Sequence, residues 1–358
     1  MKVLLCADIR SVHTQRWLKA LSENKIETGC FSLNSPLNKD LNIKYYEIKQ
    51  KIFCNKAGYL LALPYLKEAL KDFKPDILHA HYASGYGTLA ALSAFHPFIL
   101  SVWGSDIFSF PHKSILHRLL LTYNLKSADK ILATSKVMAN ETKKYIDKEV
   151  YITPFGIDTS KFKPTKKKGL FGKKWPIIGC FKRLDRIYGQ DYLIEAFNFF
   201  KNQGFQNSLL ILAGEGPDRI FFEKKIKSLQ LEKNVIFTGD IKPSNLPEVH
   251  NECDLEVYLS RHESFGVAVL EAGACGKPVI VSDVEGLPEI VVNEKTGFIV
   301  PKNDWLSAAK AMLKIISLPK LYNYMSKNAR KRVIKEYEWN ISIKKMLEIY
   351  RTTINSDV

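Results

Sequence analysis

The sequence predicts an α/β protein with two doubly wound domains of similar size. Short β-branched or apolar runs alternate with longer segments of helical periodicity along most of the 358 residues, which is typical of parallel sheets with crossover helices. The length corresponds to about two domains at roughly 100 to 200 residues each. Residues 156–175 are rich in Lys, Gly and Pro and lack apolar periodicity, so the domain boundary is expected there, near residue 165.

Each expected strand is a short apolar run bounded by polar or turn residues. In the first half the runs are residues 2–7, 76–81, 98–103, 130–135 and 150–155. In the second half they are residues 176–181, 208–214, 235–239, 255–260, 278–283 and 297–300. Three helical segments follow, at residues 305–316, 321–336 and from 341 to about 353. Residues 1–163 and 164–339 are therefore expected to form the two domains.

Composition excludes some classes of protein and leaves others open. Hydrophobic residues make up 46% of the chain and charged residues 25%, which is ordinary for a globular protein and excludes wholesale disorder. Lys and Arg number 53 against 37 Asp and Glu, a net charge of +16. This surplus favours an anionic partner, such as nucleic acid, anionic lipid or a phosphorylated small molecule.

The first residues and the cysteines indicate a cytoplasmic protein. Too few apolar residues precede Asp8 and Arg10 for a secretion signal, and no run of about 18 apolar residues is present, so we expect neither secretion nor a membrane span. The cysteines lie far apart, without a C-x-x-C pair or a histidine at zinc spacing, and are expected to be reduced and buried. They are Cys6, Cys30, Cys54, Cys180, Cys253 and Cys275.

The loop after the expected strand 255–260 holds the strongest chemical signal. Ligands of doubly wound sheets bind at the carboxyl ends of the strands. Glu263 lies in this loop, Gly266 stands where a helix should begin, and Glu271 falls in its second turn. A helix N-terminus entered through glycine suits a phosphate, and eight helical residues span roughly 10 Å, about the distance from a sugar ring to a ribose across a diphosphate. The pattern therefore indicates a nucleotide sugar, although helix-dipole compensation by Glu263 and a solvated Glu271 are the simpler alternatives.

This segment, ESFGVAVLEAGACGKPVIVSDVEGLPEIV, resembles the E-x7-E signature of the family 4 retaining glycosyltransferases. SADKILATS, ITPFGIDTSKFKP, AGEGP, FTGDI and TGFIVPKND also occur in the order and spacing of that family. The resemblance implies the GT-B fold, in which two Rossmann-like domains face a cleft. It implies that residues 1–163 bind the acceptor, that residues 164–339 bind the nucleotide sugar, and that a C-terminal helix, residues 340–358, crosses back to the first domain.

The resemblance also implies roles for individual residues of the second domain. Glu271 would bind the ribose hydroxyls, and Glu263 would contact the donor sugar at the catalytic centre. The backbone of Phe265, Gly266, Val267 and Ala268 would meet sugar and diphosphate, with Gly214 and Lys182 completing the donor-binding set.

A leaving diphosphate needs cations, because preorganised positive charge stabilises the developing anion. In enzymes of this kind the diphosphate is thought to help deprotonate the acceptor, so cations matter more than a general base. The loop KRLDRIYGQD stands where the family usually has an Arg and a Lys five residues apart; Arg183 matches the Arg, but Tyr188 occupies the Lys position. We expect Arg183 to be the principal diphosphate ligand with Arg186 as its partner. Lys182 is the alternative cation, and a plain surface role is the alternative for Arg186.

Candidates in the first domain follow three expected strands. The loop ADIRSVHTQRW lacks the glycine pair often found there in the family, and its His13 and Arg16 are candidates for phosphate or acceptor contacts, with a surface role for Arg16 equally open. Of two alternating histidines on a buried strand, one is often a satisfied core residue, so His81, nearer the strand end, is preferred over His79.

Trp103 and Asp106 complete the candidate residues on the acceptor side of the cleft. The family commonly has a His, associated with the 6-hydroxyl of the donor sugar, where this chain has Trp103. The replacement predicts a donor that is 6-deoxy or lacks a conventional 6-hydroxyl contact. The sequence has no paired Asp motif of the kind that binds a catalytic metal. We therefore expect no metal and no cofactor, with the nucleotide sugar as co-substrate.

Two basic clusters interleave lysines with apolar residues, from Lys56 to Lys74 and from Lys163 to Trp175. Such clusters suit an anionic membrane surface. A core helix with a wet face is the alternative for the first, and a solvated linker for the second. Many members of the family act on lipid-linked acceptors at the inner leaflet, so the clusters are expected to hold the protein there.

The sequence thus predicts a retaining glycosyltransferase that moves a sugar, with a UDP-sugar as the expected donor, to a glycan or lipid-linked glycan of a cell-surface polysaccharide or lipopolysaccharide. A GT-B sugar-nucleotide epimerase and a basic nucleic-acid-binding protein are the alternatives. The paired Glu263 and Glu271 argue against both, and no nucleic-acid partner is expected.

Overall fold

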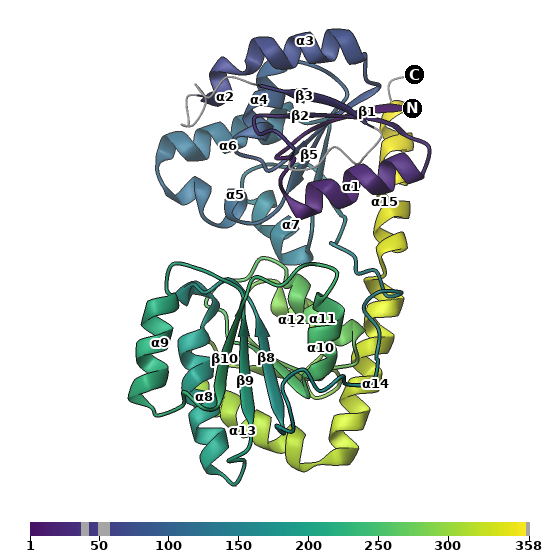
Figure 1. Ribbon diagram of the computed structural model, residues 1–358. Coiled ribbons are helices and arrows are strands. Elements are labelled where there is room, and N and C mark those ends of the chain that lie inside the picture. The colour runs from purple at the N-terminus through teal and green to yellow at the C-terminus, as the bar shows by residue number, and fades with distance from the viewer. Residues whose placement is uncertain (37–42, 49–57, 356–358) are drawn as a thin grey trace. The chain divides into compact units, whose positions relative to one another are not determined.

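The structure is a computed structural model that describes residues 1–36, 43–48 and 58–355. The chain divides into two compact units: Met1–Phe155 together with the residues from Ser342 onward, and Gly156–Ile341. Each unit is a parallel sheet with helices on both faces (Figure 1). The expected α/β class with two doubly wound domains is confirmed.

Unit 1 contains a seven-stranded parallel sheet in the order β3-β2-β1-β4-β5-β6-β7. Its strands are β1 (Lys2–Cys6), β2 (Glu27–Ser32), β3 (Lys44–Glu47), β4 (Ile77–His81), β5 (Phe98–Val102), β6 (Lys130–Ala133) and β7 (Val150–Ile152). Five of them lie where the sequence predicts strands, whereas β2 and β3 are additions. Both have mixed polar and apolar residues, ETGCFS and KYYE, so they lack the apolar run that marks the others.

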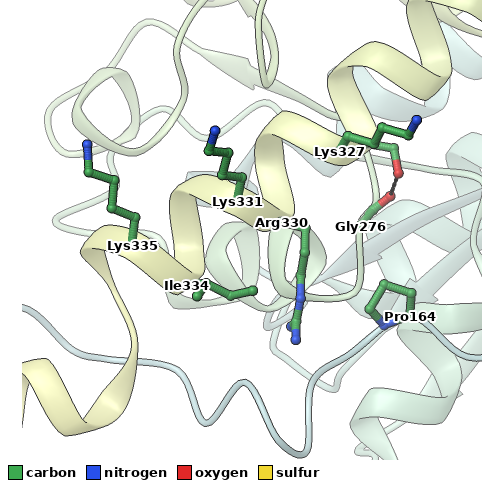
Figure 2. Close-up of a pocket in the computed structure, with 8 residues that line it drawn as sticks. Pro164, Gly276, Lys327, Arg330, Lys331, Ile334 and Lys335 are labelled. Atoms are coloured by element: carbon green, nitrogen blue, oxygen red, sulfur yellow. Dashed lines mark hydrogen bonds between the residues drawn. The ribbon is translucent and has the colours of Figure 1, made fainter.

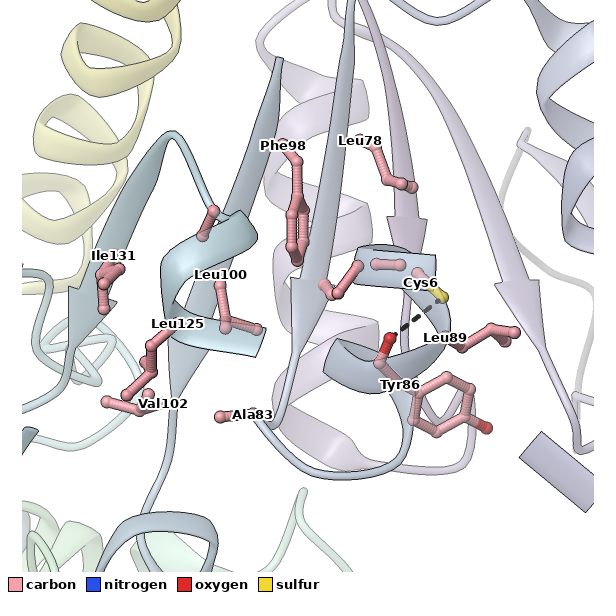
Figure 3. Packing of buried hydrophobic residues seen from close by; sticks show 14 of the residues in the cluster. Cys6, Leu78, Ala83, Tyr86, Leu89, Phe98, Leu100, Val102, Leu125 and Ile131 are labelled. Atoms are coloured by element: carbon pink, nitrogen blue, oxygen red, sulfur yellow. Dashed lines mark hydrogen bonds between the residues drawn. The ribbon is translucent and has the colours of Figure 1, made fainter. Parts of the chain in front are cut away.

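The helices of unit 1 cover this sheet and enclose its core. They are α1 (Val12–Glu23), α2 (Gly58–Leu61), α3 (Leu63–Phe73), α4 (Tyr86–Ser93), α5 (Ser105–Phe108), the 3-10 helix η2 (Phe110–His112), α6 (Ile115–Ser127) and α7 (Lys136–Lys143). Figure 3 shows part of the buried cluster, which includes Leu78 and Leu100 of the sheet and Leu125 of α6. The thiol of Cys6 points to the carbonyl oxygen of Tyr86 at 3.8 Å.

The last helix, α15 (Trp339–Asn355), returns to unit 1. Its buried Tyr350 hydroxyl lies 2.6 Å from Nδ1 of His79 on β4, and Thr352 accepts a hydrogen bond from Nζ of Lys130 at 2.7 Å. These contacts confirm the expected return of a C-terminal helix to the first domain.

Unit 2 contains a six-stranded parallel sheet in the order β10-β9-β8-β11-β12-β13. Its strands, all expected from the sequence, are β8 (Ile177–Phe181), β9 (Leu209–Ala213), β10 (Val235–Gly239), β11 (Leu255–Tyr258), β12 (Val279–Ser282) and β13 (Gly297–Val300). Its helices are η3 (Arg186–Tyr188), α8 (Gln190–Asn202), α9 (Arg219–Ser228), α10 (Leu246–Glu252), α11 (Val267–Ala274), α12 (Leu287–Ile290), α13 (Trp305–Ser317) and α14 (Pro319–Glu336).

The unit boundary falls at residues 155/156, ahead of the expected 163/164. The segment between these positions is held by unit 2. The backbone N–H of Ile157 donates to the carbonyl oxygen of Tyr337 at 2.7 Å, and the guanidinium of Arg330 donates to the carbonyl oxygens of Thr159 and Phe162 at 3.0 and 2.5 Å. Composition marks residues 156–162 as linker, but these contacts make them part of the second unit.

Other expectations concern cysteines and membrane spans. Five cysteines are unpaired and buried, as expected: Cys6, Cys30, Cys180, Cys253 and Cys275. Cys54 lies outside the described residues. Within the described ranges no helix is both long enough and apolar enough to cross a bilayer.

The strand order places the ligand-binding edge of unit 2. The order reverses at β8, which has β9 on one side and β11 on the other. Adjacent strands whose connections run to opposite faces leave a crevice at their carboxyl ends. The loops after β8 and β11, which hold Arg183 and Glu263, therefore open at that crevice.

Gly189 lets these two loops touch. Its φ is +67°, and a Cβ at this position would lie 1.8 Å from the carbonyl oxygen of Leu259, at the end of β11. We expect Gly189→Ala to lower the free energy of unfolding by more than about 3 kcal/mol, because it adds a backbone clash to left-handed strain. Gly172 has a φ of +70°, but a Cβ added there would meet no atom within 4 Å, so Gly172→Ala should cost only about 1 kcal/mol. Equal losses for both variants in urea unfolding would contradict the close approach.

Candidate functional site

A pocket of about 430 Å³ opens in unit 2 at the carboxyl ends of β8 and β9. It brings together four residues that the sequence predicts for the donor site, Lys182, Arg183, Gly214 and Glu271. The full lining is Phe181, Lys182, Arg183, Ala213, Gly214, Glu215, Asp240, Ile241, Leu246 and Glu271. The pocket thus combines two cations with carboxylates and an apolar wall.

Gly214 is needed for the loops around the pocket to meet. Its φ is +129°, and a Cβ here would lie 2.6 Å from the carbonyl oxygen of Lys182. The N–H of Gly214 donates to the carbonyl oxygen of Gly239 at 2.9 Å, and the N–H of Lys182 donates to that of Ala213 at 3.0 Å. The loops after β8, β9 and β10 are therefore fixed by backbone contacts that leave no room for a side chain.

Lys182 and Glu263 form a short ion pair beside the pocket. The side chains are only 13% and 11% exposed, so the pair is largely shielded from water. Burial lowers the pKa of Lys182, but the charge and hydrogen bond of Glu263 outweigh it and raise the pKa above its usual value. The Lys182 ammonium lies 5.1 Å from the ring centroid of Tyr188. Tyr188, which stands where the family usually has a Lys, thus makes a cation–π contact with this lysine.

The structure brings Arg183 together with Lys182, and not with Arg186. Arg183 is exposed at the mouth of the pocket. The guanidinium of Arg186 instead pairs with Asp218 at 3.4 Å and lies 5.0 Å from the ring centroid of Phe221. Arg186 begins the short helix η3, and these contacts direct its side chain toward α9, so the structure does not place the two arginines side by side.

The loop from Glu263 to the start of α11 is held by a second acidic residue. Glu285 accepts a hydrogen bond from the N–H of Glu263 at 2.9 Å, and Gly286 donates to the carbonyl oxygen of Glu263 at 3.0 Å. Gly266, the N-cap of α11, has a φ of +96°, and a Cβ there would lie 2.8 Å from Leu287. The side chains of Phe265 and Ala268 are buried, so at these positions the segment presents the backbone of a helix N-terminus and not side chains.

Glu271 belongs to a buried charge network that no sequence motif revealed. Its Oε2 lies 3.6 Å from Nε2 of His250, and Nδ1 of His250 lies 2.8 Å from Oε1 of Glu256. Tyr258 donates to the other oxygen of Glu256 at 2.5 Å. The His250 ring is stacked on Phe181 at 3.9 Å between centroids. An acidic residue in the middle of a buried strand, LEVY, is the signal that points to such a network.

His250 is a cation at neutral pH. Burial alone would lower its pKa, but the carboxylates of Glu256 and Glu271 outweigh burial and raise the pKa to about 9. The imidazolium therefore places a positive charge 3.6 Å from the Glu271 carboxylate at the pocket wall.

The first-domain candidates gather in unit 1 around an aromatic group. The rings of His81 and Trp103 lie 4.4 Å apart, and His13 is stacked on Phe155 at 4.0 Å and lies 5.9 Å from Trp103. His81 and Trp103 line a cavity of about 830 Å³. His79 is hydrogen-bonded through both ring nitrogens, to Tyr350 at 2.6 Å and Ser101 at 2.8 Å, so it is the core residue of the pair.

Electrostatics change the expected role of His13. Burial first, and then Arg16, lowers the pKa of His13 to about 4. Burial likewise lowers the pKa of His81, with His79 and His13 adding to the effect. Both rings are neutral at neutral pH, so neither can offer a positive charge to a phosphate.

Asp106 positions a loop. It is fully buried, and its carboxylate accepts hydrogen bonds from the N–H groups of Ala83 at 2.7 Å, Gly104 at 2.7 Å and Trp103 at 3.2 Å. These bonds use the carboxylate to hold the turn that carries Trp103, instead of leaving it for a ligand.

Another hollow of unit 2, about 530 Å³, lies against α14 and contains none of the predicted site residues. Figure 2 shows Arg330 and Ile334 on the side of α14 toward Pro164, whereas Lys327, Lys331 and Lys335 extend from the other side of the helix. Gly276 follows the C-terminal end of α11, opposite the N-terminal end that Gly266 caps. The hollow is therefore separate from the pocket at the strand ends.

Comparison with known proteins identifies the family. A model described as glycosyl transferases group 1 matches residues 161–332, and one described as glycosyl transferase 4-like matches residues 2–135. Together they cover most of both units. The chain belongs to the family 4-type glycosyltransferases.

Similar proteins agree with this membership. The glycosyltransferase is 27% identical over 302 residues to the N-acetyl-alpha-D-glucosaminyl L-malate synthase of Bacillus anthracis, a match that covers 79% of this chain and 76% of the relative. It is 27% identical over 308 residues to the UDP-Gal:alpha-D-GlcNAc-diphosphoundecaprenol alpha-1,3-galactosyltransferase of Escherichia coli, covering 80% and 77%.

Solved structures confirm the fold. Sucrose-phosphate synthase from Thermosynechococcus elongatus matches with a TM-score of 0.85 at 21% identity, covering 99% of this chain and 100% of that one. HepE of Anabaena in complex with UDP matches with a TM-score of 0.84 at 18% identity, covering 98% and 100%. The glycosyltransferase therefore has the GT-B fold expected from its sequence motifs.

The raised pKa of His250 predicts a pH dependence of stability. The contribution of the His250 charge to the free energy of unfolding is fully present below its pKa in the unfolded chain, about 6.5. It is lost as the pH rises through its pKa in the folded chain, about 9. We expect the difference in free energy of unfolding between wild type and His250→Gln to shrink by about 3 kcal/mol from pH 6.5 to pH 9.5. Urea unfolding at several pH values measures it. A difference that stays constant across this range would show that His250 is neutral.

Proposed function

We propose that this enzyme is a retaining, metal-independent glycosyltransferase that moves a sugar from a UDP-sugar to a lipid-linked glycan in cell-surface glycan synthesis at the cytoplasmic face of the membrane. The observation that carries the proposal is the pocket where Arg183 and the Lys182–Glu263 pair lie beside Glu271. The Escherichia coli relative, named as acting from UDP-Gal on a diphosphoundecaprenol acceptor, supports the substrate classes. The UDP complex of Anabaena HepE, a fold neighbour, agrees with the nucleotide.

The donor would be held at three points. Glu271, which lies beside His250, accepts hydrogen bonds from the ribose hydroxyls. The N-terminus of α11 and the guanidinium of Arg183 meet the diphosphate. The ammonium of Lys182 then exchanges Glu263 for a diphosphate oxygen, and the released Glu263 carboxylate turns to the donor sugar.

The chemical step needs positive charge on the leaving group. The bond between sugar C1 and the diphosphate oxygen breaks while the acceptor oxygen bonds to C1 on the same face. The acceptor proton passes to the departing diphosphate, which leaves as the nucleoside diphosphate. Arg183 and Lys182 stabilise the charge that develops on the diphosphate, so no metal is required for this role. Within residues 1–36, 43–48 and 58–355, no group of three or more metal-binding side chains is present.

Arg183→Ala is expected to lower kcat by about 100-fold or more, because loss of a preorganised donor to a developing anion has a cost of this size. Arg186→Ala is the matched control, since its guanidinium pairs with Asp218 away from the pocket, and should keep turnover within about threefold. Steady-state transfer with each variant measures this. If Arg183→Ala also stays within about threefold, the assignment of the pocket fails.

A donor panel tests the overall proposal. We expect the enzyme to hydrolyse a UDP-sugar but not GDP- or dTDP-sugars, and we expect EDTA to leave the rate unchanged. In NMR, the anomeric proton of the transfer product should show the same configuration as the donor. Inverted configuration or loss of activity in EDTA would contradict the retaining, metal-independent mechanism.

The same panel addresses the 6-position of the donor sugar. We propose a donor that is 6-deoxy or lacks a conventional 6-hydroxyl contact, because Trp103 replaces the polar residue common in the family. Its ring lies among His81, His13 and Phe155 in unit 1. Clear preference for an ordinary hexose over its 6-deoxy analogue would contradict this part.

A further inference from the structure

Helix α6 (Ile115–Ser127) presents a contiguous apolar stripe to solvent. Ile115, Leu116 and Leu119 are 67%, 72% and 59% exposed, and Leu120 and Tyr123 are also exposed. Their spacing places all five on neighbouring rows of one helix side. We call these five residues the α6 face. Single exposed apolar residues are ordinary, but a contiguous group of this kind marks an interaction surface.

The charged side chains of the segment that contains α6 are of one sign. Lys113, Arg118 and Lys126 are exposed on or beside the helix. The chain has no Asp or Glu between Asp106 and Asp129. An apolar stripe on a segment whose own charges are all basic suits a bilayer with an anionic surface, where apolar side chains insert and each Lys or Arg is attracted to lipid headgroups.

The α6 face is continuous with the apolar cavity of unit 1. Leu120 and Tyr123 belong to the face and also line the cavity of about 830 Å³. Lys113 and His117 line it from the same stretch of chain, and His81 and Trp103 line it as well. Apolar surface therefore extends from the exposed stripe to the aromatic group of the candidate site.

The two clusters expected from the sequence are less suited to this role. Lys56 and Ala57 lie outside the described residues. In the described part of that cluster, Leu61 and Tyr65 are exposed, but α3 (Leu63–Phe73) buries Leu66 and Phe73 in the core. Its Asp72 pairs with Lys44 at 2.5 Å. This is the arrangement of a core helix with a wet face.

In the second cluster the lysines are partly neutralised. Lys167 pairs with Asp254 at 2.7 Å, and Lys168 pairs with Glu248 at 2.9 Å. Leu170 and Trp175 are exposed, but they are separated in a loop and form no helical stripe.

We propose that the α6 face docks this enzyme on an anionic lipid bilayer, and that the adjoining cavity admits the part of a lipid-linked acceptor nearest the membrane. The docking stands on the surface of unit 1 alone. The use of the cavity rests on the lipid-linked acceptor of the proposed function.

Flotation of the full chain with vesicles tests the docking. We expect at least tenfold more protein to float with vesicles of phosphatidylcholine and phosphatidylglycerol than with phosphatidylcholine alone at low salt, and the excess to fall at high salt because the headgroup attraction is screened. The double variant Leu116→Ser, Leu119→Ser should lose most of this binding. Neither side chain lines the cavity.

A matched control removes equally exposed apolar residues elsewhere. Ile220 and Leu318 are 66% and 49% exposed in unit 2, and the double variant Ile220→Ser, Leu318→Ser should float like the wild type. An unchanged unfolding midpoint shows that each variant folds. Equal loss in both variants, or no flotation of the wild type, overturns the proposal.

Two further readouts separate the alternatives. If the wild type forms a dimer in light scattering that the Leu116→Ser, Leu119→Ser variant abolishes, without any flotation, the α6 face is a contact between copies and the docking proposal is overturned. UDP-sugar hydrolysis without vesicles reports on the proposed function separately. Hydrolysis without flotation removes only the docking, whereas flotation without hydrolysis removes only the proposed function.

Discussion

The candidate site depends on one steric constraint, the contact of backbones without side chains at the carboxyl ends of β8, β9 and β11. Gly189 touches the carbonyl oxygen of Leu259, and Gly214 touches that of Lys182, at distances where no Cβ fits. These contacts hold together the loops that follow the strands on either side of the point where the strand order reverses. Side chains far apart in sequence therefore meet in one pocket. Lys182 reaches Glu263 across 81 residues for this reason.

Charge is balanced within that pocket before any ligand binds. Two carboxylates of the candidate site face a cation: Glu263 faces Lys182, and Glu271 faces His250, which it shares with the buried Glu256. A buried carboxylate without such a partner would take up a proton instead of remaining ionised. The two cations are placed differently. Lys182 lines the pocket, whereas His250 is fully buried and lies against both Glu256 and Glu271.

The sequence predicted most of the fold, because buried parallel strands are recognisable as apolar runs. All six strands of unit 2 and five of the seven of unit 1 were marked in this way. The strands β2 and β3 were not predicted, because ETGCFS and KYYE contain polar residues that only pairing within the sheet accommodates. In the site, motif residues such as Arg183 and Glu271 were predicted. His250 of α10 and Glu256 of β11 belong to no motif and come within 2.8 Å of each other only in the folded chain.

By itself, the sequence determined the α/β class, the two-domain division, the family and the segment that carries the paired glutamates, since apolar periodicity and motif spacing are local properties of the chain. Only the tertiary structure decided that Lys182, and not Arg186, lines the pocket together with Arg183, because the Arg186 guanidinium contacts Asp218 and Phe221 instead. It also decided that His13 is neutral, which follows from burial, and that the exposed apolar residues of α6 share one side of a helix. These properties depend on which side chains meet and which remain in water, and that is settled only when distant segments pack.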